Sequence, residues 1–151
     1  RVLLFAWGGL VRHGHFSHAK DNIMTKSNVT LGKRLKSFPR TVKFPMLDGT
    51  EGAIECVFKY RTRKEFGAFI DGMFTDSGAA APADEKFSMA KLMDSTVEKN
   101  ADYLLEVLEG WNLDEKLNRD SAAQLCDELP GAAVAIMNEY RAAVLDGRLG
   151  N

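Results

Sequence analysis

The fold class follows from residues 41–66, which read TVKFPMLDGTEGAIECVFKYRTRKEF. Apolar and polar residues alternate in two runs, one on each side of Asp48-Gly49. Alternation with a period of two is typical of strands half-buried against a core, and glycine accepts the positive φ that a tight turn requires. We therefore predict a β-hairpin, whose inner face is formed by Val42, Phe44, Met46, Ile54, Cys56, Phe58 and Tyr60.

Two details position this hairpin in the fold. Pro45 falls inside the first strand, which indicates an edge strand because proline has no N–H group to donate to a neighbour. Thr62 and Glu65 have the spacing of a capping box. The apolar residues that follow recur at helical spacing, so the hairpin leads into a short amphipathic helix with a stripe of Phe66, Phe69, Ile70 and Met73.

The remainder of the chain is predicted to be helical. Apolar residues at helical spacing predict a long helix from Asp84 to a C-cap at Gly110. Ser121 and Gln124 predict a second capping box, and Pro130 predicts the first turn of a last helix that ends near Gly147. The predicted fold class is α+β: a small N-terminal β-hairpin followed by a mainly α-helical bundle of about four helices.

The chain divides into four segments. Residues 41–147 form the single domain, residues 24–40 an extended lead-in, and residues 148–151 a tail. We interpret residues 1–23 as a translated leader or a disordered tail, because Met24 is the first methionine and the codons of Lys20-Asp21 can contain a ribosome-binding sequence. All three histidines lie in this segment; they could ligate a metal, but a leader is the simpler interpretation.

Composition and charge limit the classes of function. The 151 residues are 45% hydrophobic and carry a formal net charge of −1, whereas general nucleic-acid binders carry a clear basic excess. No segment has the length of apolar sequence that a membrane span requires. Cys56 and Cys126 fall on apolar faces far apart, as small buried side chains in a reducing cytoplasm would.

Catalytic patterns are not found in the sequence. The histidines lie in the expected leader, and no phosphate-binding glycine motif occurs. Paired carboxylates such as Asp114 and Glu115 occupy ordinary surface or helix-start positions. We expect a protein that is not an enzyme and that uses neither a cofactor nor a metal.

The most concentrated basic patch is Lys59-Tyr-Arg-Thr-Arg-Lys64. With Tyr60 and Phe66 interleaved, it could bind nucleic acid through phosphate contacts and base stacking. The low net charge favours instead a solvated strand end or an acidic protein partner. A small regulatory or nucleic-acid-associated protein is the alternative function that this patch leaves open.

From residue 41 to about residue 145 the chain resembles the tail assembly chaperones of long-tailed bacteriophages. Features that carry the resemblance are found in the hairpin and at the start of the first helix. Others lie in the turn at Trp111-Asn-Leu-Asp114, at the helix end from Leu125 to Pro130, and in the last helix. The residues in the hairpin and first helix are Val42-Lys-Phe44, Asp48-Gly49, Val57-Phe-Lys-Tyr60 and Glu65-Phe66, and those in the last helix are Ala135, Ile136 and Tyr140.

The resemblance implies a non-enzymatic protein of the bacterial host cytoplasm that is absent from the mature virion. Its implied partners are the tape measure protein, which it would bind and keep soluble, and the tail tube protein, whose subunits it would help to recruit. Many family members also have a longer form made by a −1 frameshift, and the codons of Leu149-Gly150-Asn151 can contain a slippery sequence for one. Self-association is a further possibility that the sequence leaves open.

Candidate binding residues are of two kinds. Methionine side chains adapt to partners of varied sequence, so we expect the partner-binding surface to include Met73, Met89, Met93 and Met137, although each taken singly fits ordinary core packing. Arg61 and Arg63 are the candidates within the basic patch. The family has no invariant catalytic set that could be transferred to this chain.

Overall fold

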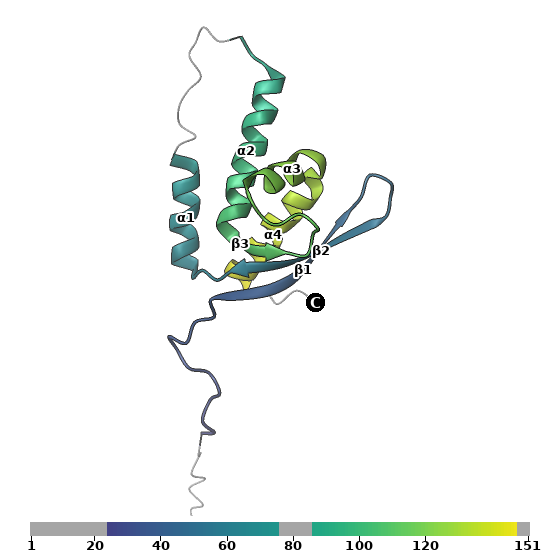
Figure 1. The fold of residues 1–151 in the computed structure, drawn as a ribbon. Helices are drawn as coiled ribbons and strands as arrows, with labels where there is room; N and C mark the ends of the chain where they lie inside the picture. The colour runs from purple at the N-terminus through teal and green to yellow at the C-terminus, as the bar shows by residue number, and fades with distance from the viewer. Residues whose placement is uncertain (1–23, 76–85, 148–151) are drawn as a thin grey trace, which may run out of the picture. The chain divides into compact units, whose positions relative to one another are not determined.

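The computed structural model describes residues 24–75 and 86–147, so the expected leader and tail lie outside the described residues. Residues 1–33 form a unit separate from residues 34–151, and the fold below is that of the second unit. In chain order its elements are β1 (Ser37–Pro45), β2 (Glu51–Lys59), α1 (Arg63–Thr75), α2 (Met89–Val107), β3 (Leu108–Trp111), α3 (Arg119–Glu128) and α4 (Pro130–Asp146) (Figure 1). The predicted α+β class is confirmed.

The hairpin is formed by β1 and β2, which pair antiparallel from Ser37 opposite Lys59 to Pro45 opposite Glu51. At the turn, Gly49 has a φ of 84°, and the Asp48 carboxylate accepts a hydrogen bond of 2.9 Å from the backbone N–H of Thr50. The turn chemistry is therefore the one that the sequence predicts. The first strand begins earlier than expected, at Ser37, because the four residues before Thr41 continue the pairing with β2.

Prolines protect the free edge of β1. Backbone hydrogen bonds join Tyr60 N–H to Lys36 and Met46 N–H to Thr50, which sets the even positions of β1 as the hydrogen-bonded pairs. Pro39 and Pro45 occupy odd positions, where an N–H group would point away from β2. Their missing donors reduce the capacity of this edge to pair with another strand. The predicted edge position of the Pro45 strand is confirmed by the order β1-β2-β3.

The third strand is the largest difference from the predicted fold. Helix α2 ends at Val107, and the chain continues as β3, which pairs antiparallel with β2 through Leu108, Gly110 and Trp111. Leu108 is buried, so the apolar residue expected to extend the helix packs into the core from a strand instead. The Asn112 side chain extends the pairing by accepting a hydrogen bond of 2.9 Å from the Glu55 N–H. The predicted C-cap at Gly110 is wrong, because residues 108–111 form backbone pairs with the free edge of β2 instead of continuing the helix.

Helix boundaries follow local capping chemistry. The predicted capping box at α1 is confirmed: Thr62 Oγ1 accepts from Glu65 N–H at 3.2 Å, and the Glu65 carboxylate accepts from Thr62 N–H at 2.8 Å. Asp84, the predicted start of the long helix, lies outside the described residues; within them α2 begins after Ser88, the N-cap, whose hydroxyl accepts from Lys91 N–H. Residues 86–88 precede the helix.

The predicted capping box at Ser121 and Gln124 is also wrong. The N-cap of α3 is Asn118, whose side chain accepts from Ser121 N–H at 3.0 Å while the Ser121 hydroxyl accepts from Asn118 N–H at 3.0 Å. Ser121 is thus the third helical residue rather than the cap. Helix α4 begins at Pro130 and ends at Gly147, which has a φ of 62°, as the sequence predicts.

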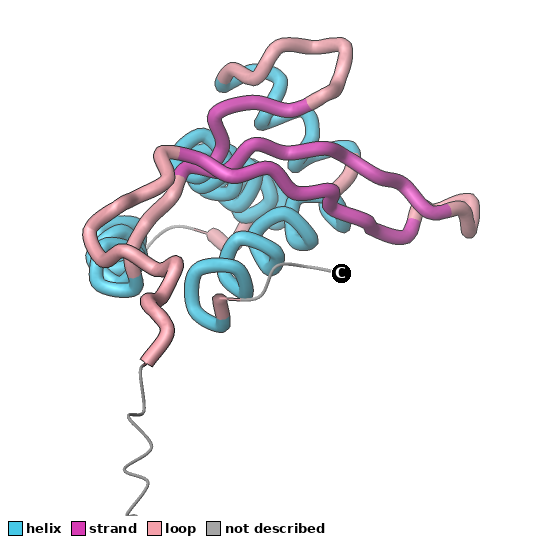
Figure 2. The backbone as a smooth tube through the Cα atoms, turned by 90° about the horizontal axis from the view of Figure 1, so that it is seen from below, coloured by secondary structure: helices cyan, strands magenta, loops and turns pink. Residues whose placement is uncertain are grey.

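The core lies between the inner face of the sheet and the helices, with Tyr140 of α4 at its centre. In Figure 2 the strands run side by side along the helices. The centre of the Tyr140 ring lies 5.4 Å from the centre of the Phe58 ring and 5.9 Å from the centre of the Phe66 ring. Tyr140 therefore joins the sheet, α1 and α4 in one aromatic cluster. Cys56 and Cys126 are buried in the same core, as expected.

Candidate partner-binding surface

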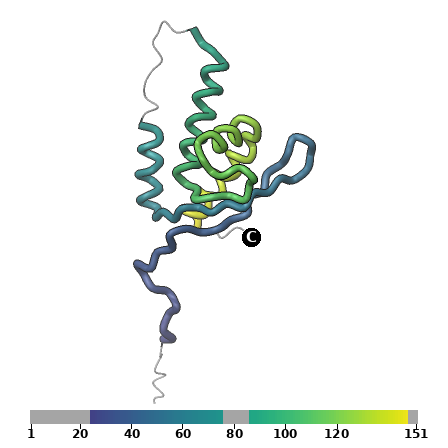
Figure 3. The backbone as a smooth tube through the Cα atoms, viewed as in Figure 1, coloured from purple at the N-terminus to yellow at the C-terminus, as the bar shows by residue number. Residues whose placement is uncertain are grey.

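Large apolar side chains remain exposed just before α2 and along its first half. The exposed fractions are 76% for Phe87, 58% for Met89, 46% for Leu92 and 49% for Met93. In Figure 3 the first turns of α2 extend past α3 toward the top of the view. We call these four residues the α2 surface.

Two residues of the α2 surface, Met89 and Met93, continue the stripe that packs into the core. Val97, Ala101 and Leu104 follow Met93 at intervals of three or four residues, which places them on one face of the helix. Ala101 and Leu104 are fully buried and Val97 is half-buried. One apolar stripe is therefore covered along its second half and open along its first.

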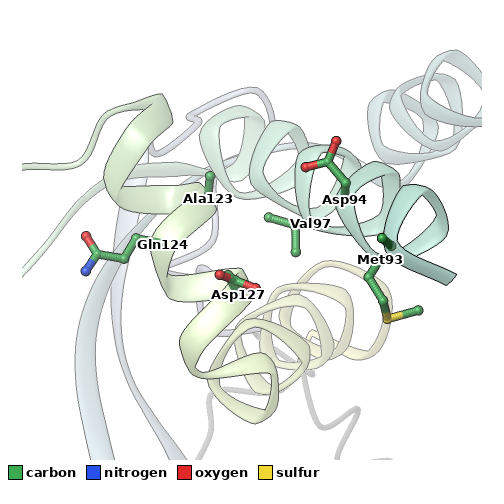
Figure 4. Close-up of a pocket in the computed structure, with 7 residues that line it drawn as sticks. Met93, Asp94, Val97, Ala123, Gln124 and Asp127 are labelled. Atoms are coloured by element: carbon green, nitrogen blue, oxygen red, sulfur yellow. The ribbon is translucent and has the colours of Figure 1, made fainter.

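A groove lies beside this surface, between α2 and α3. It has a volume of about 440 Å³ and is lined by Ala90, Met93, Asp94, Val97, Ala123, Gln124 and Asp127. Figure 4 shows Val97 and Asp127 lying between the two helices, whereas Gln124 points away from α2. Its floor is apolar and its rim carries two carboxylates. Neither Asp94 nor Asp127 forms an ion pair within the part of the chain that the structure describes.

An arginine at the start of α3 holds the two helices that form the groove. The Arg119 guanidinium binds the carboxylates of both Glu98 and Asp102, which lie one turn apart on α2. These two carboxylates raise the pKa of Arg119, chiefly through the hydrogen bond with Asp102. The two contacts, made by partly exposed side chains, link the start of α3 to α2. The groove is therefore a built feature of the helix packing.

Three of the four cations of the predicted basic patch bind groups elsewhere in the fold. Lys59 Nζ donates to the Leu105 carbonyl at 3.1 Å. Arg61 donates to the Tyr140 hydroxyl at 3.0 Å and to Glu106 at 3.2 Å, and its guanidinium lies 4.6 Å from the centre of the Phe69 ring. Arg63 donates to the Leu145 carbonyl in the last turn of α4. Lys59, Arg61 and Arg63 thus join the β2–α1 connection to the helices.

A family model described as phage tail assembly chaperone matches residues 24–151. The chain belongs to the phage tail assembly chaperone family. The matched range is wider than the stretch from 41 to about 145 that carries the resemblance in the sequence. Comparison with curated proteins and with solved structures found no match. The structure thus describes most of the residues that define this chain as a tail assembly chaperone.

The four candidate methionines occupy three separate places in this tail assembly chaperone. Met89 and Met93 lie together on the α2 surface, and Met93 also lines the groove. Met73 is half-buried on α1, and Met137 is half-buried against the core on α4. Phe87, which precedes α2, and Leu92, which lies on it, were not among the candidates.

Chemically reactive groups are sparse in the described part of the chain. No group of three or more His, Cys, Asp or Glu residues within residues 24–75 and 86–147 could hold a metal ion. Burial raises the pKa of the Cys56 thiol to about 12 and that of Cys126 to about 11, which disfavours the reactive thiolate. None of the helices described here combines the length and apolar character needed to cross a membrane.

Proposed function

We propose that this tail assembly chaperone binds apolar helical segments of the tape measure protein through the α2 surface and keeps that protein soluble. The observation that carries the proposal is the open first half of the α2 stripe. Exposed contiguous apolar surface of this kind is typical of interaction sites. Two methionines among its four residues allow it to fit segments of different sequence.

The groove beside the α2 surface supports a helical partner. Two packed helices with an apolar floor between them form a site into which a third amphipathic helix can lay its apolar face. Asp94 and Asp127 on the rim favour a partner helix that carries lysine or arginine beside its apolar stripe. A soluble chaperone–partner complex would then cover the apolar surface of both proteins.

The wider role that we propose follows from family membership. The protein acts in the host cytoplasm without catalysing a reaction, helps to recruit tail tube subunits to the tape measure protein, and is absent from the finished virion. A frameshift-extended form and self-association belong to the same proposal. The nucleic-acid alternative is not carried forward, because Lys59, Arg61 and Arg63 bind groups within the fold.

Co-expression with the tape measure protein of the same phage tests the proposal. Leu92→Asp places a charge in the middle of the α2 surface, and Val134→Asp is a matched control, because Val134 is also helical and 49% exposed. We expect soluble tape measure protein with the wild-type chain and with Val134→Asp, and aggregated tape measure protein with Leu92→Asp. Equal solubility with both variants would count against binding at the α2 surface.

A further inference from the structure

A second groove lies at the other end of the helical layer, between β1, the β2–α1 connection and the last turns of α4. Its volume is about 420 Å³, which is within the usual range for ligand sites. Apolar side chains and three arginines line it together, and we call it the arginine groove, defined by Leu35, Phe38, Arg40, Arg61, Arg63 and Val144. It shares no residue with the α2 surface or with the groove between α2 and α3.

Within residues 24–75 and 86–147, two of these arginines, Arg40 and Arg63, have no hydrogen-bonded carboxylate. The Arg40 guanidinium carbon lies 5.3 Å from the centre of the Phe38 ring, and its Nη1 atom donates to the Pro39 carbonyl at 3.0 Å. Its Nε atom is buried and has no hydrogen-bond partner among the described residues. The nearest carboxylate, that of Glu139, is 3.7 Å from this Nε atom, beyond hydrogen-bond range. Arg63 bonds to a neutral backbone carbonyl, that of Leu145. Arg40 thus has one carboxylate at ion-pair distance, that of Glu139, whereas Arg63 has no ion pair among the described residues.

The apolar lining defines the other half of the site. Phe38 and Val144 are half-buried, and Leu35 at the rim is 67% exposed. Arginine guanidinium groups bind carboxylates with two parallel hydrogen bonds, and an apolar floor beside them favours a hydrocarbon or aromatic side chain. The site therefore combines positively charged arginine side chains with an apolar surface that can contact one apolar side chain of a ligand.

We propose that the arginine groove binds an acidic peptide segment of a partner protein, with Asp or Glu side chains at Arg40 and Arg63 and an apolar side chain over Phe38 and Val144. An RNA or DNA strand fits less well, because phosphate binding favours a continuous row of cations, whereas Glu139 and Glu106 interrupt this one. The proposal does not depend on the α2 surface, since the two sites use different elements.

A selection on the wild-type chain with a displayed library of random peptides tests the inference. We expect the selected peptides to be enriched in Asp and Glu close to a Leu, Phe or Trp residue. In a fluorescence anisotropy titration, the double variant Arg40→Gln, Arg63→Gln should bind these peptides about tenfold more weakly or worse. Lys64→Gln, Arg141→Gln is the matched control, because it removes the same charge from exposed positions that do not line the groove.

A second variant keeps the test valid if the arginine variant unfolds. Leu35→Glu replaces an exposed apolar residue at the rim with a negative charge, so it should fold normally and still weaken binding. Leu92→Asp should leave binding unchanged, which separates this site from the proposed chaperone surface. Selected peptides without acidic residues, or peptides bound equally by the arginine variant, would overturn the proposal. So would a single-stranded RNA oligonucleotide that displaces the peptides and loses its own binding in the arginine variant.

Discussion

The Tyr140 hydroxyl donates a hydrogen bond of 3.0 Å to the backbone carbonyl of Lys59 and accepts one of 3.0 Å from Arg61. These bonds join the middle of α4 to the end of β2, at the point where the sheet passes into α1. The Tyr140 ring is fully buried in the aromatic cluster, and burial raises the pKa of its hydroxyl. A single side chain therefore satisfies two polar groups where the sheet and the helices meet.

Tyr140→Phe should destabilise the fold. The substitution retains the ring but leaves the Lys59 carbonyl and one Arg61 nitrogen without a partner, which typically costs about 1–2 kcal/mol in the free energy of unfolding. Urea denaturation followed by circular dichroism measures the change. Tyr60→Phe is the control, because Tyr60 is 40% exposed and should change stability by less than about 0.5 kcal/mol. Equal midpoints for the two variants would contradict the role assigned to the Tyr140 hydroxyl.

Gly52→Ala should also be destabilising, because of close packing inside the hairpin. A Cβ atom at Gly52 would lie 2.6 Å from Phe44 Cε2 and 2.9 Å from Met46 Sδ. Phe44 is buried and cannot move away without cost, so we expect a loss of about 1–3 kcal/mol. Gly67→Ala in α1 is the matched control: its Cβ would meet no atom within 4 Å, and alanine favours a helix by about 0.5–1 kcal/mol. The thermal midpoints of the two variants should shift in opposite directions.

The two cysteines should be unreactive in the folded protein. With pKa values raised to about 12 for Cys56 and about 11 for Cys126, both thiols stay protonated at neutral pH, and both are buried. Titration with a thiol reagent should show almost no reaction in native buffer and reaction of both thiols in urea. Rapid modification of either thiol under native conditions would mean that the core opens more readily than this packing allows.

Acid should remove the stabilisation that Glu65 provides. The Thr62 N–H group, and after it Arg34, hold the pKa of this carboxyl below its usual value of 4.5. A lowered folded-state pKa means that the stabilisation is fully present above the unfolded pKa and is lost as pH falls through the folded one. Glu65→Gln should therefore lower the urea midpoint at about pH 7, and the difference from wild type should shrink by about pH 2. A difference that stays constant over this range would show that the Glu65 charge contributes nothing.

Much of the fold could be predicted because local chemistry decides it. Three local patterns show this: the Asp48-Gly49 turn, the capping box of Thr62 and Glu65, and the placement of Pro130 at the start of α4 with Gly147 as its C-cap. The strand β3 could not be predicted in this way. Leu104, Val107 and Leu108 fit a helical stripe, and only the open edge of β2, distant in sequence, turns Leu108 into a strand residue.

The proposed binding surface could be predicted only in part from the sequence. Methionine content singled out Met89 and Met93, which are exposed in the structure, but periodicity cannot distinguish a covered stripe from an open one, and α2 has both. That distinction depends on where α3 ends relative to α2, which is a tertiary property. Arg61 and Arg63 appeared as free surface charges for the same reason, since their partners Tyr140, Glu106 and Leu145 lie far along the chain.

Hydrogen–deuterium exchange on the complex with the tape measure protein tests the central claim most directly. The claim is that the open first half of α2 is the surface on which this tail assembly chaperone holds its partner. Peptides that cover residues 87–97 should exchange more slowly in the complex than in the free chain, while those covering residues 51–56 of β2 should not change. Unchanged exchange across residues 87–97 in a stable complex would contradict the account.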